Sequence, residues 1–471
     1  MIKYNYKEKR KLHFFLPEDQ ALFDYDYIFS ASAAWVELGM QDVVATFDLL
    51  VRDLPRQRNF LLFAGLEEMI SGILSWKFTQ DDIAFLLKRK IITPKLVPLL
   101  KNFKFDGDVW AMPEGSIFFP GEPVLRITGK LWQINLFTFF LMNSLTSNTV
   151  FSSKLARCIL VAGRKLYVAT CSPVRGNAHE AALKFGRAAY LFGSASGMVP
   201  GFAKKFAIPF KSRARGFHAF IKSFSDELTA MRALAKIFPD SSVMIDTYDL
   251  KTGIRNAITV AREQKKLGQP VFSAVFIDSG ANVEEFAKQA RFVRRELDKA
   301  GLKEIQITVA GNFEEYKIKK LVQLGAPVDK VILGTEGIAP ADDPKIEAVL
   351  KMAQFIRQGV VVETAKLATG KVSYPGLKQV FRTFDKRGMM RSDVIGLEHE
   401  KNLGRPILQQ FIKHGVLARP LPDLDQLREF VTQQLETLPG RLKGIDQRVA
   451  FPVKMSKLLE GLLQKVKRRH L

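Results

Sequence analysis

The sequence contains few of the residues that build disulfide scaffolds and zinc sites. Only two of its 471 residues are cysteines, Cys158 and Cys171, and they do not form a CxxC pair. The six histidines include no HxxxH or HExxH spacing. The sequence therefore predicts neither a disulfide-rich domain nor a zinc site. So little cysteine favours a reducing compartment, and we expect a cytoplasmic protein.

Long apolar runs are also missing. The most apolar stretch, residues 132–145, contains Gln133 and Asn135 and is shorter than the roughly 20 residues that span a bilayer. Residues 1–10 lack the apolar core of a signal peptide. We therefore expect a soluble, intracellular protein without a membrane partner. No GxxxxGK[ST] motif is present, which excludes a P-loop nucleotide hydrolase.

Negative charge is scarce relative to positive charge. Lys and Arg number 71 against 48 Asp and Glu, which gives a formal net charge of +23. Such a surplus favours an anionic partner: nucleic acid, a phosphorylated metabolite or an acidic membrane surface. The cations are spread along the chain, with local concentrations at residues 204–222 and 465–469. Spread charge is more typical of a solvated surface than of a nucleic-acid-binding stripe, so we do not expect nucleic acid.

The composition is otherwise that of a globular protein. Hydrophobic residues make up 47% and charged residues 25% of the chain. The length predicts two or three domains, because a single core stops growing near about 250–300 residues. Phe is abundant, with 37 residues against 9 Tyr and 4 Trp, which predicts a large core built from phenyl rings.

Residues 165–340 alternate between short apolar runs and helical patterns. The runs lie at residues 242–249, 272–280, 305–311 and 330–337, and the helical patterns at 252–267, 283–300 and 313–324. Asp246 and Asp278 are 32 residues apart, and Asp278 and Gly311 are 33 apart. This period is typical of βαβ units in a parallel sheet, either open and doubly wound or closed into a barrel.

In both arrangements the carboxyl ends of the strands share one edge, where ligands bind. The residues that follow the strands are Asp246, Asp249, Asp278, Ser279, Gly280, Gly311, Asn312, Gly334 and Thr335. Glycines at strand ends let backbone N–H groups approach a phosphate. Each of them alone is more often a plain turn, and three at consecutive strand ends make the two interpretations about equal. The carboxylates suit Mg²⁺ or a ribose, and Asp249 could instead cap the next helix. His218 follows three basic residues and is either a packed histidine or a phosphate contact.

The flanking regions have a different pattern. Residues 81–90 and 94–103 have helical patterns, and residues 108–128 predict a β-rich meander with Pro and Gly turns. After residue 340 we expect a helix, a turn-rich patch at residues 369–376 and a helical tail.

Several segments taken together resemble the nicotinate phosphoribosyltransferase family. The resemblance covers roughly residues 20–400 and is carried by residues 45–67, 105–115, 119–123, 245–249, 277–280, 311–316, 333–335 and 374–382. It implies an irregular parallel α/β barrel and an open-faced α/β domain built from both chain ends. We assign residues 1–150 to the open-faced domain and residues 151–345 to the barrel with the phosphoribosyl site. Residues 346–471 form a segment that partly returns to the first domain and ends in a helical basic tail.

The resemblance also implies an activity in NAD biosynthesis from recycled nicotinate. The family joins nicotinate to 5-phosphoribosyl-1-pyrophosphate, which gives nicotinate mononucleotide and pyrophosphate. It uses Mg²⁺, couples the reaction to ATP hydrolysis through a phosphorylated histidine, and is commonly dimeric. We therefore expect an enzyme that is a phosphoprotein and a homodimer, with nicotinate, 5-phosphoribosyl-1-pyrophosphate and ATP as its small-molecule partners.

Residue roles follow from the same resemblance. Tyr27 occupies the position that stacks on the pyridine ring, and Arg175 matches an arginine that serves the nicotinate carboxylate and the phosphates. Asp246 and Asp278 match acidic residues at the ribose and metal, and His218 matches the phosphorylated histidine if two residues are inserted before it. The implied phosphate and ribose contacts are Ser279, Gly280, Gly311, Asn312, Gly334 and Thr335.

The sequence departs from the family at four places around this edge. The second arginine of the family's pair is Gly176, and residues 211–215 replace a Gly-Thr pair with basic residues. Phe276 and Ala281 replace an arginine and an aspartate, and residues 194–198 replace a Thr-Ser-Asn-like segment. Two alternatives therefore stay open: a catalytically degenerate relative that binds a nucleotide or an anionic polymer, and a transferase for another base such as nicotinamide.

Overall fold

The computed structural model describes residues 20–170, 175–194, 199–210 and 213–470. The chain divides into two compact units. Unit 1 comprises Met1–Val150, Lys345–Leu442 and Arg448–Leu471, and unit 2 comprises Phe151–Pro344 and Lys443–Gln447. Across the residues that the structure describes, no helix has the length and hydropathy that a membrane span requires.

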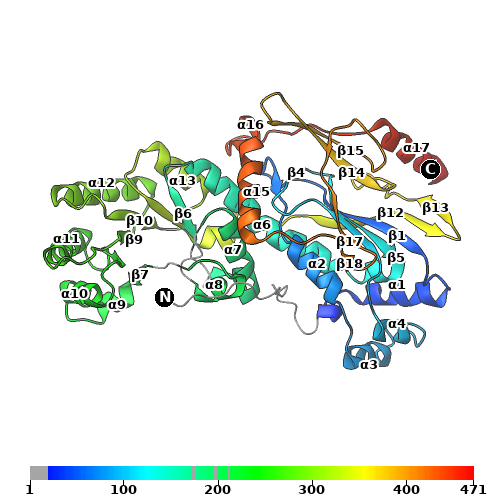
Figure 1. Ribbon diagram of the computed structural model, residues 1–471, viewed down its shortest axis with the longest axis horizontal. Coiled ribbons are helices and arrows are strands. Elements are labelled where there is room, and N and C mark those ends of the chain that lie inside the picture. The colour runs from blue at the N-terminus through cyan, green and yellow to red at the C-terminus, as the bar shows by residue number, and fades with distance from the viewer. Residues whose placement is uncertain (1–19, 171–174, 195–198, 211–212, 471) are drawn as a thin grey trace. The chain divides into compact units, whose positions relative to one another are not determined.

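Unit 2 contains a six-stranded parallel sheet with the order β6-β11-β10-β9-β8-β7. Figure 1 labels its strands β6, β7, β9 and β10. Every neighbouring pair of these strands is parallel. The strands are β6 (Tyr167–Thr170), β7 (Ala214–Gly216), β8 (Ser242–Met244), β9 (Ala274–Ile277), β10 (Gln306–Ala310) and β11 (Lys330–Leu333). Within the described residues β6 and β7 are the two edges, so the sheet is an incomplete α/β barrel, which confirms the predicted fold.

The helices that connect these strands confirm the predicted alternation. α11 (Leu250–Lys266), α12 (Val283–Lys299) and α13 (Glu315–Gln323) follow β8, β9 and β10. Each begins at a side chain that accepts a hydrogen bond from the backbone of the first turn, respectively Asp249, Asn282 and Glu314. Each also buries one apolar stripe against the unit, as the 3.6-residue period requires. The remaining helices of unit 2 are α7 (His179–Leu191), α8 (Pro200–Phe206), α9 (His218–Lys222), α10 (Glu227–Ile237) and α14 (Thr335–Ile338).

Unit 1 is built from both halves of the chain. Its main sheet has the order β13-β12-β1-β5-β3-β17-β18 and is antiparallel throughout. The early strands are β1 (Val44–Val51), β3 (Asp108–Ala111) and β5 (Pro123–Lys130). The late strands are β12 (Ala348–Arg357), β13 (Val360–Glu363), β17 (Gln409–Lys413) and β18 (Val416–Leu417). This interleaving confirms a domain formed from both chain ends.

Smaller sheets and helices complete unit 1. The order β16-β14-β15-β19 forms a four-stranded sheet, and β2 pairs with β4. The strands are β2 (Leu61–Leu62), β4 (Ile117–Phe118), β14 (Lys378–Phe384), β15 (Met390–Leu397), β16 (Arg405–Pro406) and β19 (Val453–Met455). The helices are η1 (Gln20–Leu22), α1 (Asp26–Glu37), α2 (Leu66–Ser75), α3 (Gln80–Lys88), α4 (Val97–Lys101), α5 (Leu131–Asn135), α15 (Leu424–Thr437), α16 (Gly440–Lys443) and α17 (Lys457–His470). The boundary between the units falls within α6 (Thr138–Ala162).

One predicted element is wrong. We expected a helix after residue 340, before the turn-rich patch at residues 369–376. Residues 345–357 do contain several residues that favour helices, such as Ala, Leu and Lys. The structure instead has β12, whose backbone pairs with β1 on one side and β13 on the other. Pairing on both edges outweighs the local helical preference, because strand formation depends mainly on the neighbouring strands and on burial.

Phenyl rings carry much of the core of unit 1, as the composition predicted. The fully buried Phe137 meets Trp76, Phe103 and Phe105 edge-on, with ring centroids 5.0, 5.9 and 5.7 Å away. Edge-to-face contacts of this kind add stability beyond the burial of apolar area.

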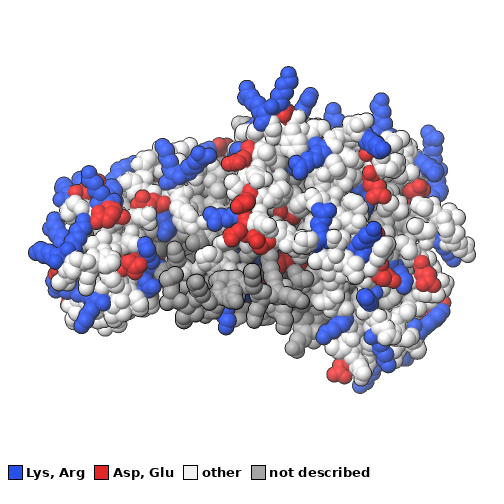
Figure 2. All heavy atoms as spheres, in the orientation of Figure 1, with Lys and Arg blue, Asp and Glu red and all other residues white. Residues whose placement is uncertain are grey.

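Lys and Arg are distributed over the face shown in Figure 2 and are interspersed with Asp and Glu.

Unit 1 also buries ionised side chains. Arg382 donates three hydrogen bonds to Asp393: Nη2 to Oδ2 at 2.6 Å, Nε to Oδ1 at 2.9 Å and Nε to Oδ2 at 3.2 Å. The fully buried Glu122 lies beside them and accepts the backbone N–H of Phe119 at 2.9 Å. Burial, followed by the charge of Asp393 and a hydrogen bond to it, raises the pKa of Glu122 well above its ordinary value. The positive charge of Arg382 opposes this rise only in part.

We expect the raised pKa of Glu122 to make stability depend on pH. The folded chain binds this proton more tightly than the unfolded chain, so the stabilisation is complete below the ordinary glutamate pKa. This stabilisation is lost as the pH rises through the raised pKa of Glu122. Stability is measured as the urea concentration at the midpoint of unfolding, which should fall in wild type between about pH 5 and pH 9. In Glu122→Gln, whose side chain is neutral at every pH, this midpoint should fall less. Glu429→Gln, at an exposed position of α15, should keep the wild-type pH profile; parallel profiles for all three proteins would contradict the assignment.

Candidate functional site

The residues that follow the strands β7 to β11 lie along one edge of the sheet of unit 2. His218 follows β7, Asp246 follows β8 and Asp278 follows β9. The predicted phosphate-binding pairs Gly311–Asn312 and Gly334–Thr335 follow β10 and β11. Because all neighbouring strands are parallel, their carboxyl ends share an edge, which is where ligands bind in α/β folds.

Direct contacts link the ends of β7, β8 and β9. The backbone N–H of Asp278 donates to Asp246 Oδ2 at 2.6 Å. His218 Nε2 lies 3.8 Å from Asp278 Oδ2, and His218 Nδ1 lies 3.1 Å from the hydroxyl of Thr247. The structure thus brings His218, Asp246 and Asp278 together. Sequence analysis did not single out Thr247, although it stands next to Asp246 in the same strand-end segment.

The electrostatics of this cluster favour binding of positive charge. Partial burial, followed by the negative charge of Asp246, raises the pKa of Asp278, while His218 opposes the rise. Asp246 Oδ1 is buried and has no hydrogen-bond partner in the described part of the chain. A buried carboxylate oxygen without a partner is costly unless a ligand supplies one. The cluster therefore has a free acceptor for a cation or a hydroxyl group.

Sequence analysis missed a further carboxylate near this cluster. Glu227 is 5% exposed and is the first residue of α10, and its Oε2 accepts a hydrogen bond from Asn256 at 3.0 Å. Burial raises the pKa of Glu227, the Asn256 bond lowers it, and the charges of Asp246 and Asp249 raise it further. Nothing in the sequence distinguishes Glu227 from an ordinary acidic residue in the first turn of a helix, so its burial could not be predicted.

Asp249 caps the helix that follows it, which is the alternative to a role at the site. Its Oδ2 accepts the backbone N–H and the hydroxyl of Thr252, both at 2.8 Å, so it caps α11. These hydrogen bonds lower the pKa of Asp249.

The loop between β10 and α13 brings backbone close to an aromatic ring. A Cβ atom at Gly311 would lie 2.4 Å from the ring of Phe286, and one at Gly280 would lie 2.8 Å from the same ring. Asn312 has a left-handed backbone (φ 53°), and its carbonyl accepts Lys317 Nζ at 2.9 Å. Lys317 is a cation at this edge that sequence analysis did not single out.

The structure also describes the other predicted contacts. Gly334 is the residue before α14, and Thr335 is its first residue. Ser279 is exposed directly after Asp278, and Arg175 is exposed beyond β6. Tyr27 belongs to unit 1, where it is 59% exposed on α1 and stacks on Tyr25 with ring centroids 5.3 Å apart.

The structure describes the surroundings of several positions that depart from the family pattern. A Cβ at Gly176 would lie 2.7 Å from Ile338 Cδ1, so Ile338 packs where a side chain would begin. Phe276 lies within β9, and the backbone N–H of Ala281 donates to Glu285 at 2.8 Å. Ser194 is buried, and its hydroxyl donates to Thr170 at 3.4 Å. Residues 195–198, 211 and 212 lie outside the described residues.

The acidic side chains of the cluster offer carboxylate oxygens, which hard cations such as Mg²⁺ prefer. The described residues contain no group of three His, Cys, Asp or Glu side chains that could hold a metal. Mg²⁺ is commonly bound through one or two carboxylates, with water and substrate phosphates as the other ligands. Asp246 and Asp278, with the partnerless Asp246 Oδ1, suit such a shared ion.

Comparisons with known proteins point to one family. Residues 23–146 match the nicotinate phosphoribosyltransferase N-terminal domain, and residues 404–463 match the nicotinate phosphoribosyltransferase C-terminal domain. A nicotinate phosphoribosyltransferase of Mycobacterium tuberculosis is 31% identical over 95% of this chain and 94% of its own length. The Bacillus subtilis nicotinate phosphoribosyltransferase is 27% identical over 89% of both chains. The crystal structure of human nicotinic acid phosphoribosyltransferase has the same fold, with a TM-score of 0.79 and 21% identity over 94% of this chain and 100% of that one.

We expect Gly311→Ala to destabilise unit 2. The added methyl group would meet the ring of Phe286 at 2.4 Å, and overpacking of this kind costs about 1–3 kcal/mol. Gly201→Ala, at a glycine of α8 with nothing within 4 Å of the added Cβ, is the matched control and should not destabilise the chain. Urea unfolding measures both; equal stability of the two variants would show that the loop has room for a side chain.

Proposed function

The chain belongs to the nicotinate phosphoribosyltransferase family, and we propose that it makes nicotinate mononucleotide for NAD biosynthesis. The substrates are nicotinate and 5-phosphoribosyl-1-pyrophosphate, and the second product is pyrophosphate. The observation that carries this proposal is the 31% identity to the Mycobacterium tuberculosis relative over 95% of the chain. The cluster of His218, Asp246 and Asp278 at the carboxyl ends of three adjacent strands supports it.

The reaction determines what these residues must do. As pyrophosphate leaves, positive charge develops on the ribose ring and negative charge on the leaving group. In this proposal the carboxylates of Asp246 and Asp278 stabilise the ribose, and the hydrogen bond from the Asp278 backbone to Asp246 supports their relative position. The loops at Gly311–Asn312 and Gly334–Thr335 hold the 5′-phosphate through backbone N–H groups.

Asp246 and Asp278 would also hold Mg²⁺ together with the substrate phosphates. When bound, the ion neutralises the negative charge that develops on pyrophosphate. Arg175 binds the nicotinate carboxylate, for which a planar guanidinium offers two parallel hydrogen bonds. Tyr27 stacks on the pyridine ring, and the enzyme acts as a cytoplasmic homodimer.

In this proposal ATP couples to the reaction by phosphorylating His218. The γ-phosphoryl group moves from ATP to a ring nitrogen, and ADP leaves. Thr247 holds the imidazole at Nδ1, and Asp278 lies 3.8 Å from Nε2, so each ring nitrogen has a residue of the cluster beside it. Hydrolysis of the phosphorylated ring then releases phosphate.

The assay that tests the function is product formation by the purified protein. It contains Mg²⁺, 5-phosphoribosyl-1-pyrophosphate and nicotinate, with and without ATP, and parallel reactions contain nicotinamide or quinolinate. Nicotinate mononucleotide should form, and ATP should increase its yield. If only another base gives product, the proposed substrate changes but the proposed type of reaction stays the same. A folded protein that forms no product with any base would contradict the proposal and favour a nucleotide-binding or polymer-binding relative.

In the same assay we expect Asp278→Asn to lose most activity. The substitution keeps the shape and the backbone N–H but removes the negative charge, so kcat/KM should fall on the order of a hundredfold or more. Asp226→Asn is the matched control, because Asp226 caps α10 through Thr229 and asparagine caps equally well. Wild-type activity in Asp278→Asn would remove Asp278 from the site.

We expect His218 to carry phosphate after incubation with ATP. Phosphohistidine is labile in acid and stable in alkali, so radiolabel from the γ-position of ATP should show that pattern and should be absent from His218→Gln. His414→Gln is the matched control, because His414 also faces a carboxylate, that of Asp108, at 3.8 Å but lies in unit 1. Label that persists in His218→Gln would place the phosphate elsewhere, and an unlabelled wild-type protein would show that coupling to ATP is absent.

A further inference from the structure

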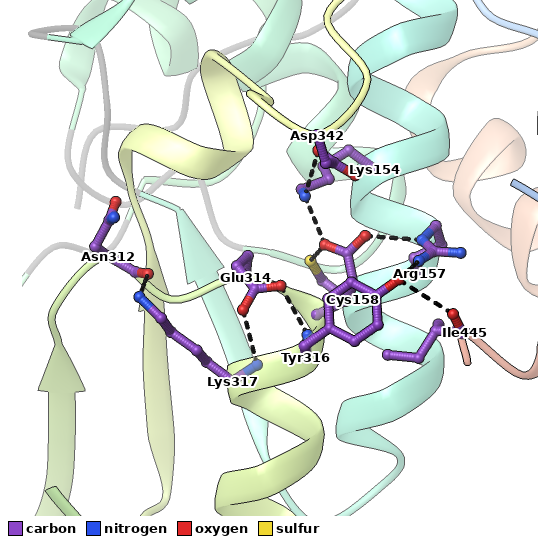
Figure 3. A network of polar contacts seen from close by, with 10 residues as sticks. Lys154, Arg157, Cys158, Asn312, Glu314, Tyr316, Lys317, Asp342 and Ile445 are labelled. Carbon is purple, nitrogen blue, oxygen red and sulfur yellow. Dashed lines mark hydrogen bonds and ion pairs between the residues drawn. The ribbon is translucent and has the colours of Figure 1, made fainter. Parts of the chain in front are cut away.

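A network of buried charges lies at the start of α13, around Glu315, four residues after Gly311. Glu315 is fully buried, its Oε2 lies 2.6 Å from Lys154 Nζ, and its Oε1 lies 2.8 Å from Arg157 Nε. Lys154 also pairs with Asp342 at 2.8 Å. Lys154 and Arg157 are one turn apart on α6, and Figure 3 shows them with Cys158 beside the first turn of α13. The carboxylate of Glu315 thus ties α13 to α6.

The charges in this network compensate one another. Burial alone would lower the pKa of Lys154, but the charge of Glu315 and the hydrogen bonds to Asp342 and Glu315 outweigh it and raise the pKa. Lys154 therefore stays protonated, and Glu315 has a cation on each of its two oxygens. A buried charge that loses its partner is strongly destabilised, so this geometry is hard to deform.

The same short segment fixes the conformation of the loop before it. Glu314 caps α13 by accepting the backbone N–H groups of Tyr316 and Lys317 at 2.8 and 2.9 Å. Lys317 reaches back to the carbonyl of Asn312, whose left-handed backbone is an uncommon conformation for a residue other than glycine. The loop from Gly311 to Glu314 is therefore tied to the first turn of α13, and that turn is tied to α6 through Glu315.

A segment from the C-terminal part of the chain completes the arrangement. The hydroxyl of Tyr316 donates to the carbonyl of Ile445 at 3.2 Å and accepts Arg157 Nη2 at 3.3 Å (Figure 3). Lys319 pairs with Asp446. Lys443–Gln447, which contains Ile445 and Asp446, belongs to unit 2, although its neighbours in the sequence on both sides belong to unit 1. We call these contacts of Glu315, Tyr316 and Lys319 the α13 clamp.

We propose that Glu315 and Tyr316 are positioning residues, and that the α13 clamp holds the Gly311–Asn312 loop in the shape that receives the 5′-phosphate of 5-phosphoribosyl-1-pyrophosphate. This inference rests on the proposed function. The physical reason is that backbone N–H groups bind a phosphate well only if they already point at it, because otherwise binding must order the loop. Glu315 and Tyr316 act through the loop and need not touch the substrate.

The experiment compares two Tyr→Phe variants of unit 2. Tyr316→Phe removes the hydroxyl between Arg157 and Ile445 and keeps the ring, which Arg157 overlies at 5.8 Å. Tyr167→Phe removes a hydroxyl that donates to the carbonyl of Gly193 at 2.9 Å, at the amino end of β6, and is the matched control. Tyr316→Phe should raise the KM for 5-phosphoribosyl-1-pyrophosphate on the order of fivefold, with kcat and the KM for nicotinate within about twofold of wild type.

Hydrogen exchange gives a readout that does not depend on turnover. In the protein without substrate, the backbone amides of residues 311–317 should exchange faster in Tyr316→Phe than in wild type and Tyr167→Phe. Asp446→Asn, which weakens the exposed pair with Lys319, should shift both readouts in the same direction by about twofold. Both variants leave the buried Glu315 pair intact, so their folding is not at risk as it would be in Glu315→Gln.

The outcomes separate this inference from the proposed function. If wild type forms no product, the proposed function fails, and faster exchange in Tyr316→Phe still supports the clamp. If exchange and KM in Tyr316→Phe equal those of wild type, the clamp does not position the loop. Equal changes in Tyr316→Phe and Tyr167→Phe would likewise overturn the inference, because they would reflect a general loss of stability.

Discussion

The common direction of six strands is the constraint on which the candidate site depends. Side chains that are up to 117 residues apart in the sequence, His218 and Thr335, lie at one edge because each follows a strand of the same parallel sheet. A short hydrogen bond, from the backbone N–H of Asp278 to Asp246 Oδ2, then fixes two of these strand ends against each other. The sheet supplies the approximate position of each functional group, and such local bonds supply its orientation.

Buried charge is the second recurring feature, and each unit contains its own compensated cluster. Unit 1 buries Arg382 with Asp393 and Lys378 with Asp48, and unit 2 buries Lys154 and Arg157 with Glu315. Because a buried ion is tolerated only in a well-bonded geometry, these clusters limit the arrangements that the surrounding backbone can adopt. Most of the positive charge behind the value of +23 lies instead in side chains of the surface, and the face in Figure 2 shows it mixed with acidic side chains.

The sequence predicted the parts of the structure that depend on local pattern. The apolar runs and the 32- and 33-residue spacing located β8 to β11 and the helices between them, and strand direction then placed Asp246 and Asp278 at one edge. It could not predict β12, because that strand owes its existence to pairing with β1 about 300 residues earlier. Nor could it predict Glu227 or Glu315, whose burial depends on tertiary neighbours and whose sequence context is that of an ordinary first helical turn.

The interleaved sheet of unit 1 has a consequence for biosynthesis. β1 lies between β5 and β12, so one of its edges has no partner until Ala348 has left the ribosome. At about 5–20 residues per second, synthesis of the stretch from β5 to β12 takes roughly 10–40 s. During this interval unit 2 can fold almost completely, while an apolar strand edge of unit 1 stays open to other chains. Nascent copies on one messenger therefore expose the same open edge at the same time, which favours pairing between chains until β12 has been made.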